Sequence, residues 1–177
     1  LSKTSPMEGT VISADSQLQG RGQLGAKWFS DSHKNLSFSV YLEPVFLAAT
    51  EIFYLSKMSS IAIVNALHKL YPKEKFLIKW PNDIYAEGKK LCGILIENAL
   101  SGGKVQHSII GIGMNVNEKE FPSSISNAIS LYQLTGSEYA PQQVALIIRE
   151  HVMAMLEEET YDWKSEYDQY VFGKGKQ

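Results

Sequence analysis

The sequence has little of what disulfide-bonded, metal-binding and membrane-spanning proteins depend on. Its one cysteine, Cys92, cannot form an internal disulfide, and its place in an apolar run predicts a small buried residue and not a nucleophile. The four histidines are dispersed, with no pair at metal-ligand spacing, so we expect no metal site. No apolar run is long enough to cross a bilayer, and no signal peptide is visible. These absences predict a cytoplasmic protein without a membrane partner.

The composition is otherwise that of one globular domain. The 177 residues are 44% hydrophobic and 20% charged, which suffices for a sizeable core. The formal net charge of -2 disfavours a surface that coats nucleic acid. The chain begins at Leu1 without an initiator methionine and ends in Gly173-Lys174-Gly175-Lys176 before its last residue, so we expect it to be a segment of a longer protein.

The stretch Lys79–Glu97 predicts two short strands joined by a polar turn. Pro81 lacks an N–H and stops or kinks the first run, and Glu87-Gly88 makes a tight turn before the return strand. Lys89 and Lys90 begin that return strand, where successive side chains point to opposite faces. One of the two lysines therefore faces inward as a candidate anion site. From spacing alone, two ordinary turn lysines remain the alternative.

A glycine cluster earlier in the chain predicts a loop that can approach a ligand closely. Gly20, Gly22 and Gly25 lie within six positions, and Arg21 between them can bind an anion. A floppy surface loop is the alternative, but Trp28-Phe29 favours a segment that folds over a flat ligand. The G-x-G-x-x-G spacing is met by count. However, no helix follows and no Gly-Lys-Ser/Thr ending is present, so neither a dinucleotide fingerprint nor a P-loop is predicted.

The remaining segments predict an α+β fold. Strands are expected at 10–16, 36–42 (half-buried) and 104–117, and helices at 45–71 and 141–167. Ser59-Ser60 could break the first helix, on which His68 and Lys69 should lie at the surface. Tight turns between neighbouring strands force antiparallel pairing. We therefore expect a mixed, largely antiparallel central sheet with helices packed on one side.

Two smaller features leave alternatives open. Gly111 and Gly113 lie inside the strand predicted at 104–117, where they would let a ligand lie flat, or would mark a bulge or a close helix contact. The run Glu157-Glu158-Glu159 is expected to be a solvated face and not a metal site.

Three segments together resemble the catalytic domain of biotin protein ligases. They are Gly20-Arg21-Gly22-x-x-Gly25-x-x-Trp28, then Lys79-Trp80-Pro81-Asn82-Asp83 with Lys90-Leu91-x-Gly93-Ile94-Leu95, then Gly111-Ile112-Gly113-x-Asn115-x-Asn117. The resemblance covers about Thr10 to Tyr170 and implies that residues 1–177 form one catalytic domain, related in fold to class II aminoacyl-tRNA synthetases. The family's Ser-Thr-Asn biotin motif, its C-terminal β-domain and any helix-turn-helix are not found in this segment. No nucleic-acid partner is therefore expected for it.

The resemblance implies a two-step reaction. Such enzymes join biotin to ATP as biotinoyl-5'-AMP, release pyrophosphate, and pass biotin to a lysine of a carrier domain. Biotin and ATP are the implied substrates, and Mg²⁺ is implied by the ATP chemistry. The implied partners are the biotin carboxyl carrier protein domain of a biotin-dependent carboxylase and a second copy in a homodimer.

The resemblance also implies roles for individual residues. Lys90 and Arg21 are the expected catalytic residues. Contacts with biotin are expected from Gln17, Gly20, Arg21, Gly22, Gln23, Lys90, Gly111 and Gly113. Contacts with ATP or the adenylate are expected from Arg21, Trp28, Asn35, Lys79, Asn82, Lys90 and Asn115.

This chain departs from the family where many members have arginines, at Gln23 and Ala26. Two fewer cations should weaken retention of the adenylate. Other interpretations are a ligase for lipoate or another acyl group on the same fold, a non-catalytic sensor of biotin or nucleotide, and a plain α+β interaction domain.

Overall fold

A six-stranded antiparallel sheet forms the centre of the molecule. The computed structural model describes residues 6–17, 19–25, 27–28, 33–158 and 163–173. The strands lie in the order β1-β4-β8-β7-β6-β5, and every pair is antiparallel. Their bounds are β1 (Val11–Ala14), β4 (Leu36–Leu42), β5 (Phe76–Lys79), β6 (Asp83–Ala86), β7 (Lys89–Ser101) and β8 (Lys104–Met114). A separate two-stranded ribbon pairs β2 (Gly20–Arg21) with β3 (Lys27–Trp28).

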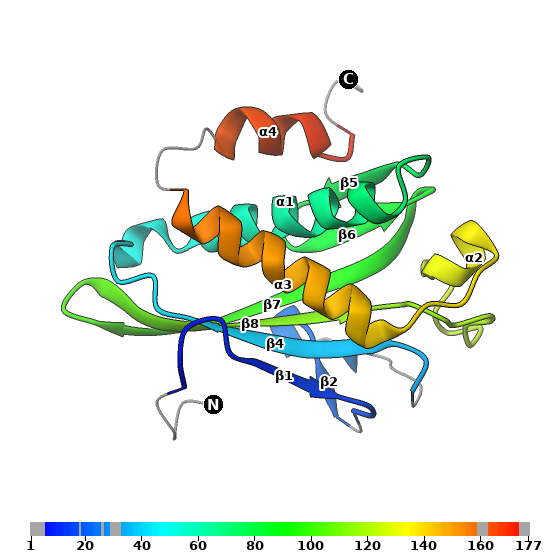
Figure 1. The fold of residues 1–177 in the computed structure, drawn as a ribbon, viewed down its shortest axis with the longest axis horizontal. Helices are drawn as coiled ribbons and strands as arrows, with labels where there is room; N and C mark the ends of the chain where they lie inside the picture. Colours follow the sequence, from blue (N-terminus) through cyan, green and yellow to red (C-terminus); the bar gives the residue numbers. More distant parts are fainter. Residues whose placement is uncertain (1–5, 18, 26, 29–32, 159–162, 174–177) are drawn as a thin grey trace.

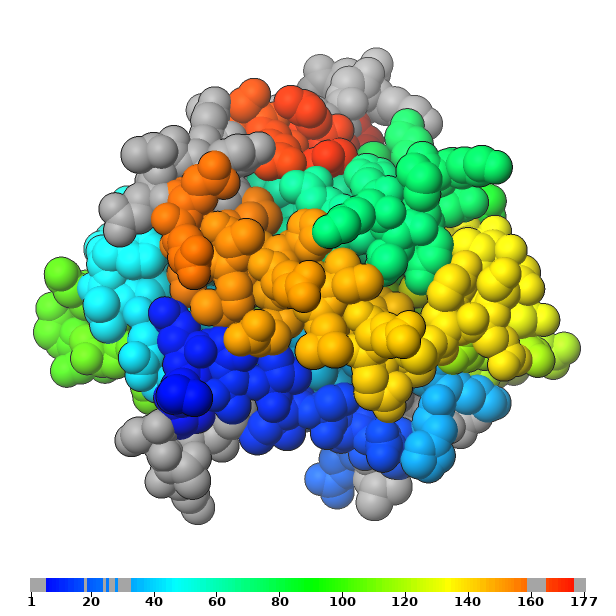
Figure 2. Space-filling view, in the orientation of Figure 1, coloured from blue at the N-terminus to red at the C-terminus, as the bar shows by residue number. Residues whose placement is uncertain are grey.

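Helices cover one face of the sheet, as the sequence predicts (Figure 1). The long helices α1 (Phe53–Leu70) and α3 (Pro141–Glu157) pack on each other and on the strands, and α4 (Trp163–Tyr170) packs on α1 and β5. Figure 2 shows α3, coloured orange, as an outer layer of this face. The short elements are η1 (Gln23–Gly25), η2 (Ala49–Glu51) and α2 (Leu131–Thr135). Within the described ranges, no helix is long and apolar enough to span a membrane.

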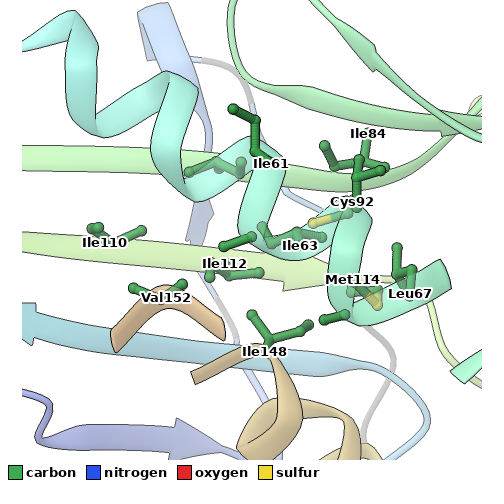
Figure 3. Close-up of a cluster of buried hydrophobic side chains, with 14 of the residues drawn as sticks. Ile61, Ile63, Leu67, Ile84, Cys92, Ile110, Ile112, Met114, Ile148 and Val152 are labelled. Carbon is green, nitrogen blue, oxygen red and sulfur yellow. The ribbon is translucent and has the colours of Figure 1, made fainter. Parts of the chain in front are cut away.

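The core lies between the sheet and these helices (Figure 3). Ile61 and Leu67 of α1 and Ile148 of α3 are fully buried against alternate residues of β8 such as Ile110. Each such side chain contributes about 1.5–3 kcal/mol through the apolar surface it removes from water. Cys92 belongs to this core, and burial raises the pKa of its thiol, so it is the small buried residue that the sequence predicts.

The prediction of a break at Ser59-Ser60 is wrong. Helix α1 is continuous there and both serines are fully buried. Ser60 Oγ donates to the carbonyl oxygen of Ser56 at 2.7 Å, so a hydroxyl that could compete with the helix is bonded back to it. Helix α1 also begins at Phe53 and not at Val45, because residues 45–51 form turns and η2.

Three further predictions need correction. The helix expected over 141–167 is divided into α3 and α4. Strand β4 is buried along both faces and not half-buried, because one face packs toward α3 and the other lines a cavity. His68 is partly buried, with its ring 5.5 Å from those of Phe76 and Tyr170, whereas Lys69 is exposed as expected. Glu157 and Glu158 are exposed, and Glu159 lies outside the described residues.

Candidate functional site

A cavity of about 400 Å³ lies on the face of the sheet that the helices leave uncovered. Side chains alternate between the two faces of a strand, so Ile110, Ile112 and Met114 of β8 point to the core while Gly111 and Gly113 point the other way. The volume is within the range usual for small-molecule sites. Nine of the predicted site residues line this cavity: Gln17, Arg21, Gly22, Gln23, Trp28, Asn82, Lys90, Gly111 and Gly113.

The floor of the cavity is a row of small residues across three strands. Gly113 of β8 is paired with Ser37 of β4 on one side and with Gly93 of β7 on the other. The indole of Trp28 lies on this row: a Cβ atom on Gly113 would be 2.7 Å from Trp28 Nε1, and one on Gly93 would be 3.2 Å from Trp28 Cζ3. Gly113 is therefore required for the close approach of an aromatic ring, here the protein's own. A bulge or helix contact, the alternative from sequence, does not occur at this position.

The inward lysine is Lys90. Its Nζ lies 2.7 Å from Asp83 Oδ1 and 5.5 Å from the centre of the Trp28 ring, whereas Lys89 is exposed. Glu87 and Gly88, with φ of 50° and 74°, make the tight turn that sets this register. The hairpin thus places one cation inside the cavity with a carboxylate as its partner.

Asn82 holds the corner between β5 and β6. Its side-chain Nδ2 donates to the backbone carbonyl oxygen of Ile94 at 2.8 Å, and the backbone carbonyl oxygen of Asn82 accepts from Ile94 N at 2.9 Å. These two bonds tie the corner to β7, so Asp83 and Lys90 face each other at a fixed separation. The Trp80–Pro81 peptide bond in this corner is cis.

A second ion pair lies at the opening of the cavity. Arg21 of β2 reaches Glu97 of β7, with Nη2 3.4 Å from Oε1, and both side chains are largely exposed. A pair of this kind contributes only about 0–1 kcal/mol, so Arg21 is available to another anion. Gly20 lets the ribbon close, because a Cβ atom there would lie 2.5 Å from the carbonyl oxygen of Trp28.

Three predicted nucleotide contacts lie outside the cavity lining. Asn35 is buried, with Nδ2 bonded to Glu118 Oε2 at 3.2 Å and Oδ1 accepting from Val116 N at 3.0 Å. Asn115 donates to the carbonyl oxygens of Ile129 at 3.1 Å and Lys90 at 3.3 Å. The observed geometry gives both amides a scaffolding role, and Asn115 supports the backbone of Lys90.

Lys79 is the third of these residues. Its Nζ donates to Tyr85 Oη at 3.0 Å, and this hydrogen bond raises the pKa of the lysine. Direct contacts of Asn35, Asn115 and Lys79 with ATP therefore stay predictions that this geometry does not by itself support.

Sequence reasoning missed several residues of the cavity. Ser37 and Ser39 face it from β4, and Glu97 faces it from β7. The period of two along β4 and β7 could have placed them, since Gly93, Leu95 and Glu97 share one face. No cluster of three or more metal-binding side chains occurs in the part of the chain that the structure describes.

Comparisons with known proteins agree with this geometry. Residues 1–115 match the biotin/lipoate A/B protein ligase family. A solved structure of biotin protein ligase from Aquifex aeolicus, in complex with biotin and ATP, superposes with a TM-score of 0.81 and is 33% identical, covering 95% of this chain and 71% of that chain.

Curated relatives are similar over a part of their length. The bifunctional ligase/repressor of Bacillus subtilis is 34% identical over 141 residues, which are 78% of this chain and 43% of that protein. The biotin–[acetyl-CoA-carboxylase] ligase of Mycobacterium tuberculosis is 31% identical over 114 residues, 63% of this chain and 41% of that protein. This chain thus spans about two fifths of the length of these relatives.

Proposed function

Because this chain belongs to the biotin/lipoate A/B protein ligase family, we propose that the protein activates biotin with ATP to biotinoyl-5'-AMP and transfers it to a lysine of a carrier protein. The observation that carries the proposal is Lys90, held inside the cavity by Asp83 and beside Gly93. A fixed ammonium group at the end of a flat glycine row suits a ligand with a carboxylate at one end.

The first step needs stabilisation of negative charge. The biotin carboxylate is a poor acyl donor, and its attack on the α-phosphate of ATP forms a C–O–P linkage while pyrophosphate leaves. Lys90 would hold the carboxylate and then the phosphoryl oxygens as charge builds on them, a kind of electrostatic contribution that is often large in enzymes. Arg21 would leave its weak pair with Glu97 and bind the phosphate.

The ribbon would keep water from the intermediate. A mixed anhydride hydrolyses readily, so a cover over the cavity protects it until the acceptor lysine attacks the acyl carbon and AMP leaves. Gln17, Gly22 and Gln23 come from the segment that includes the ribbon and line the cavity. We assign them to the ligand, together with Gly20, Gly111 and Gly113, and assign Trp28 and Asn82 to the adenylate side.

Mg²⁺ is expected to accompany ATP through its phosphates. The described residues offer no three-ligand cluster for it, and the carboxylates of Asp83 and Glu97 are engaged by Lys90 and Arg21. No step above depends on the metal. A biotin carboxyl carrier protein domain as the acceptor, a homodimer, the lack of a nucleic-acid partner and a cytoplasmic location also stay predictions.

A transfer assay tests the proposal. The complete protein is incubated with ATP, a carrier domain and either biotin or lipoate, and the mass of the carrier domain is measured. We expect a gain of one biotinyl group that requires ATP, and none with lipoate. Addition of a lipoyl group to the carrier domain would identify the protein as a lipoate ligase instead. Biotin binding without any transfer would favour a non-catalytic biotin sensor.

A further inference from the structure

The indole of Trp28 covers the part of the cavity floor that leads to Lys90. A Cβ atom on Gly113 would be 2.7 Å from Trp28 Nε1, and one on Gly93 would be 3.2 Å from Trp28 Cζ3. Lys90 Nζ lies at the same place, 3.3 Å from a Cβ position on Gly93 and 5.5 Å from the centre of the Trp28 ring. At Gly111, further along the floor, the nearest atoms come from β4 and β7 and not from Trp28. The indole therefore separates the open part of the cavity from its cation.

The proposed reaction needs this part of the floor. The carboxylate of biotin would react beside Lys90, so the chain of the ligand has to lie over Gly93 and Gly113. Carbon atoms in optimal contact are about 3.5–4.0 Å apart, and the ring already lies closer than this to the Cβ positions of both glycines. The indole and the ligand therefore exclude each other in front of Lys90.

The indole is held in this position by weak contacts. Apolar packing on the glycines and the cation–π contact with Lys90 stabilise it. However, Trp28 Nε1 is buried without a hydrogen-bond partner among the described residues, and this opposes the position because an indole N–H can only donate. A ligand carboxylate that pairs with Lys90 competes for the cation, so ligand binding weakens the hold on the ring.

The ribbon that carries Trp28 can move without disrupting the central sheet. Strands β2 and β3 share two residue pairs, Gly20 with Trp28 and Arg21 with Lys27, and form a sheet separate from the six-stranded one. A two-stranded ribbon is by itself only marginally stable in water. The exposed pair of Arg21 with Glu97 adds little. Displacing the indole therefore breaks few of the interactions that maintain the fold.

We propose that Trp28 is an autoinhibitory plug: in the free protein its indole occupies the place of the ligand in front of Lys90, and the ligand binds only by displacing it. The inference rests on the proposed function, in which the ligand is biotin and the displaced indole then lies on the adenylate side. A plug of this kind lowers the apparent affinity for the ligand in proportion to the fraction of free molecules in which the site is open.

Calorimetric titration of Trp28→Ala with biotin, in the absence of ATP, tests the plug. We expect the affinity for biotin to rise about three- to tenfold, which corresponds to an indole that closes roughly two thirds to nine tenths of the free molecules. Trp28→Phe, with a smaller ring that can still cover the glycines, should lie between Trp28→Ala and the wild type. The matched control is Trp80→Ala, at an exposed tryptophan outside the cavity lining, and it should bind biotin like the wild type. An unchanged or lower affinity in Trp28→Ala would overturn the plug.

Fluorescence reports the displacement itself. The chain has three tryptophans, Trp28, Trp80 and Trp163. Biotin alone should increase the quenching of wild-type emission by acrylamide, because the indole of Trp28 leaves the sheet. This increase should persist in Trp80→Phe and disappear in Trp28→Phe. No increase in the wild type, or one that survives in Trp28→Phe, would overturn the plug.

The adenylate separates a plug from a merely structural residue. Trp28→Ala should bind biotin more tightly but release biotinoyl-5'-AMP faster, because the indole is assigned to the adenylate side. A structural defect would weaken the binding of both ligands, and that result would overturn the plug.

The outcomes for the plug and for the proposed function are distinct. A wild-type protein that prefers lipoate would overturn the proposed function, and the plug would then stand or fall by the same rise in affinity for lipoate in Trp28→Ala. If neither the wild type nor Trp28→Ala binds biotin or lipoate, both proposals are overturned.

Discussion

At the scale of the residue, the candidate site depends on which of two neighbouring lysines faces inward. The spacing of Lys89 and Lys90 predicts that one does, but not which. The choice is made by the register of β6 against β7, which pairs Tyr85 with Lys90 and shifts between Ile84 and Tyr85. A local register shift leaves no trace in a hydrophobic pattern, so the partner of Lys90 could not be named from the sequence.

Asp83 should position Lys90 for the reaction. Asp83→Asn removes the negative charge 2.7 Å from Lys90 Nζ, and hydrogen bonds to charged groups contribute about 1.5–3 kcal/mol. We expect the biotin-dependent exchange of pyrophosphate into ATP, which reports formation of the adenylate, to slow by about tenfold or more. Glu138→Gln, which breaks the exposed pair with Lys119 at 3.1 Å, is the control and should retain the wild-type rate. Equal exchange rates in Asp83→Asn and Glu138→Gln would show that Lys90 does not depend on Asp83 for its position.

Gln23 should set how long the adenylate is retained. It is exposed and lines the cavity, and a cation there would attract the phosphate, whereas Ala26 lies outside the described residues. Gln23→Arg should slow dissociation of biotinoyl-5'-AMP several-fold at low salt, and less at high salt because the attraction is screened. Stopped-flow or filter-binding release measures this. A dissociation rate that does not fall in Gln23→Arg would contradict the hypothesis that the missing arginines weaken retention of the adenylate.

At the scale of the element, the sequence predicts which strands pair through tight turns. It does not predict where the β2–β3 ribbon contacts the sheet. Glu87-Gly88 identifies the hairpin of β6 and β7 because a positive φ is needed there, and Gly102-Gly103, also at positive φ, joins β7 to β8. The contact of Trp28 with Gly113 joins residues 85 positions apart, and no local preference encodes it. The glycines on β8 could only suggest that something flat lies against them.

The contact between ribbon and sheet can be tested by a double-mutant cycle. Gly113→Ala places a methyl group within the van der Waals radius of the Trp28 indole, and overpacking of this kind costs about 1–3 kcal/mol. We expect the melting temperature to fall by about 3–10 °C. In a Trp28→Ala background the same change should have little effect. Equal shifts in both backgrounds would mean that the indole does not rest on Gly113.

At the scale of the whole molecule, the sequence predicts an antiparallel sheet with helices on one side, and the structure has this architecture. The division of the C-terminal helix into α3 and α4 was missed, although α4 completes the packing around α1 and β5. Such long-range packing also decides the surroundings of His68, which a surface helix position would have left in water.

His68 should make stability depend on pH. Contact with Phe76 and Tyr170 buries the ring, and this burial lowers the pKa of His68 below its ordinary value of 6.5. The unfolded chain therefore binds a proton more readily, so stability falls as pH drops from about 6.5 toward the folded pKa. The melting temperature should decrease less between pH 7.5 and 5.5 in His68→Gln than in the wild type. Lys69→Gln, which changes the exposed neighbour, should show the same decrease in melting temperature as the wild type. The same decrease in His68→Gln would show that the pH dependence does not come from His68.

The most direct test of the central claim is biotin-dependent exchange of pyrophosphate into ATP by the complete protein. This exchange reports formation of the adenylate alone, without the acceptor protein. We predict exchange with biotin and none with lipoate, lost in Lys90→Ala and retained in Lys89→Ala, whose side chain is exposed. Biotin binding without exchange, or exchange that survives in Lys90→Ala, would contradict the account of a ligase whose inward lysine activates biotin.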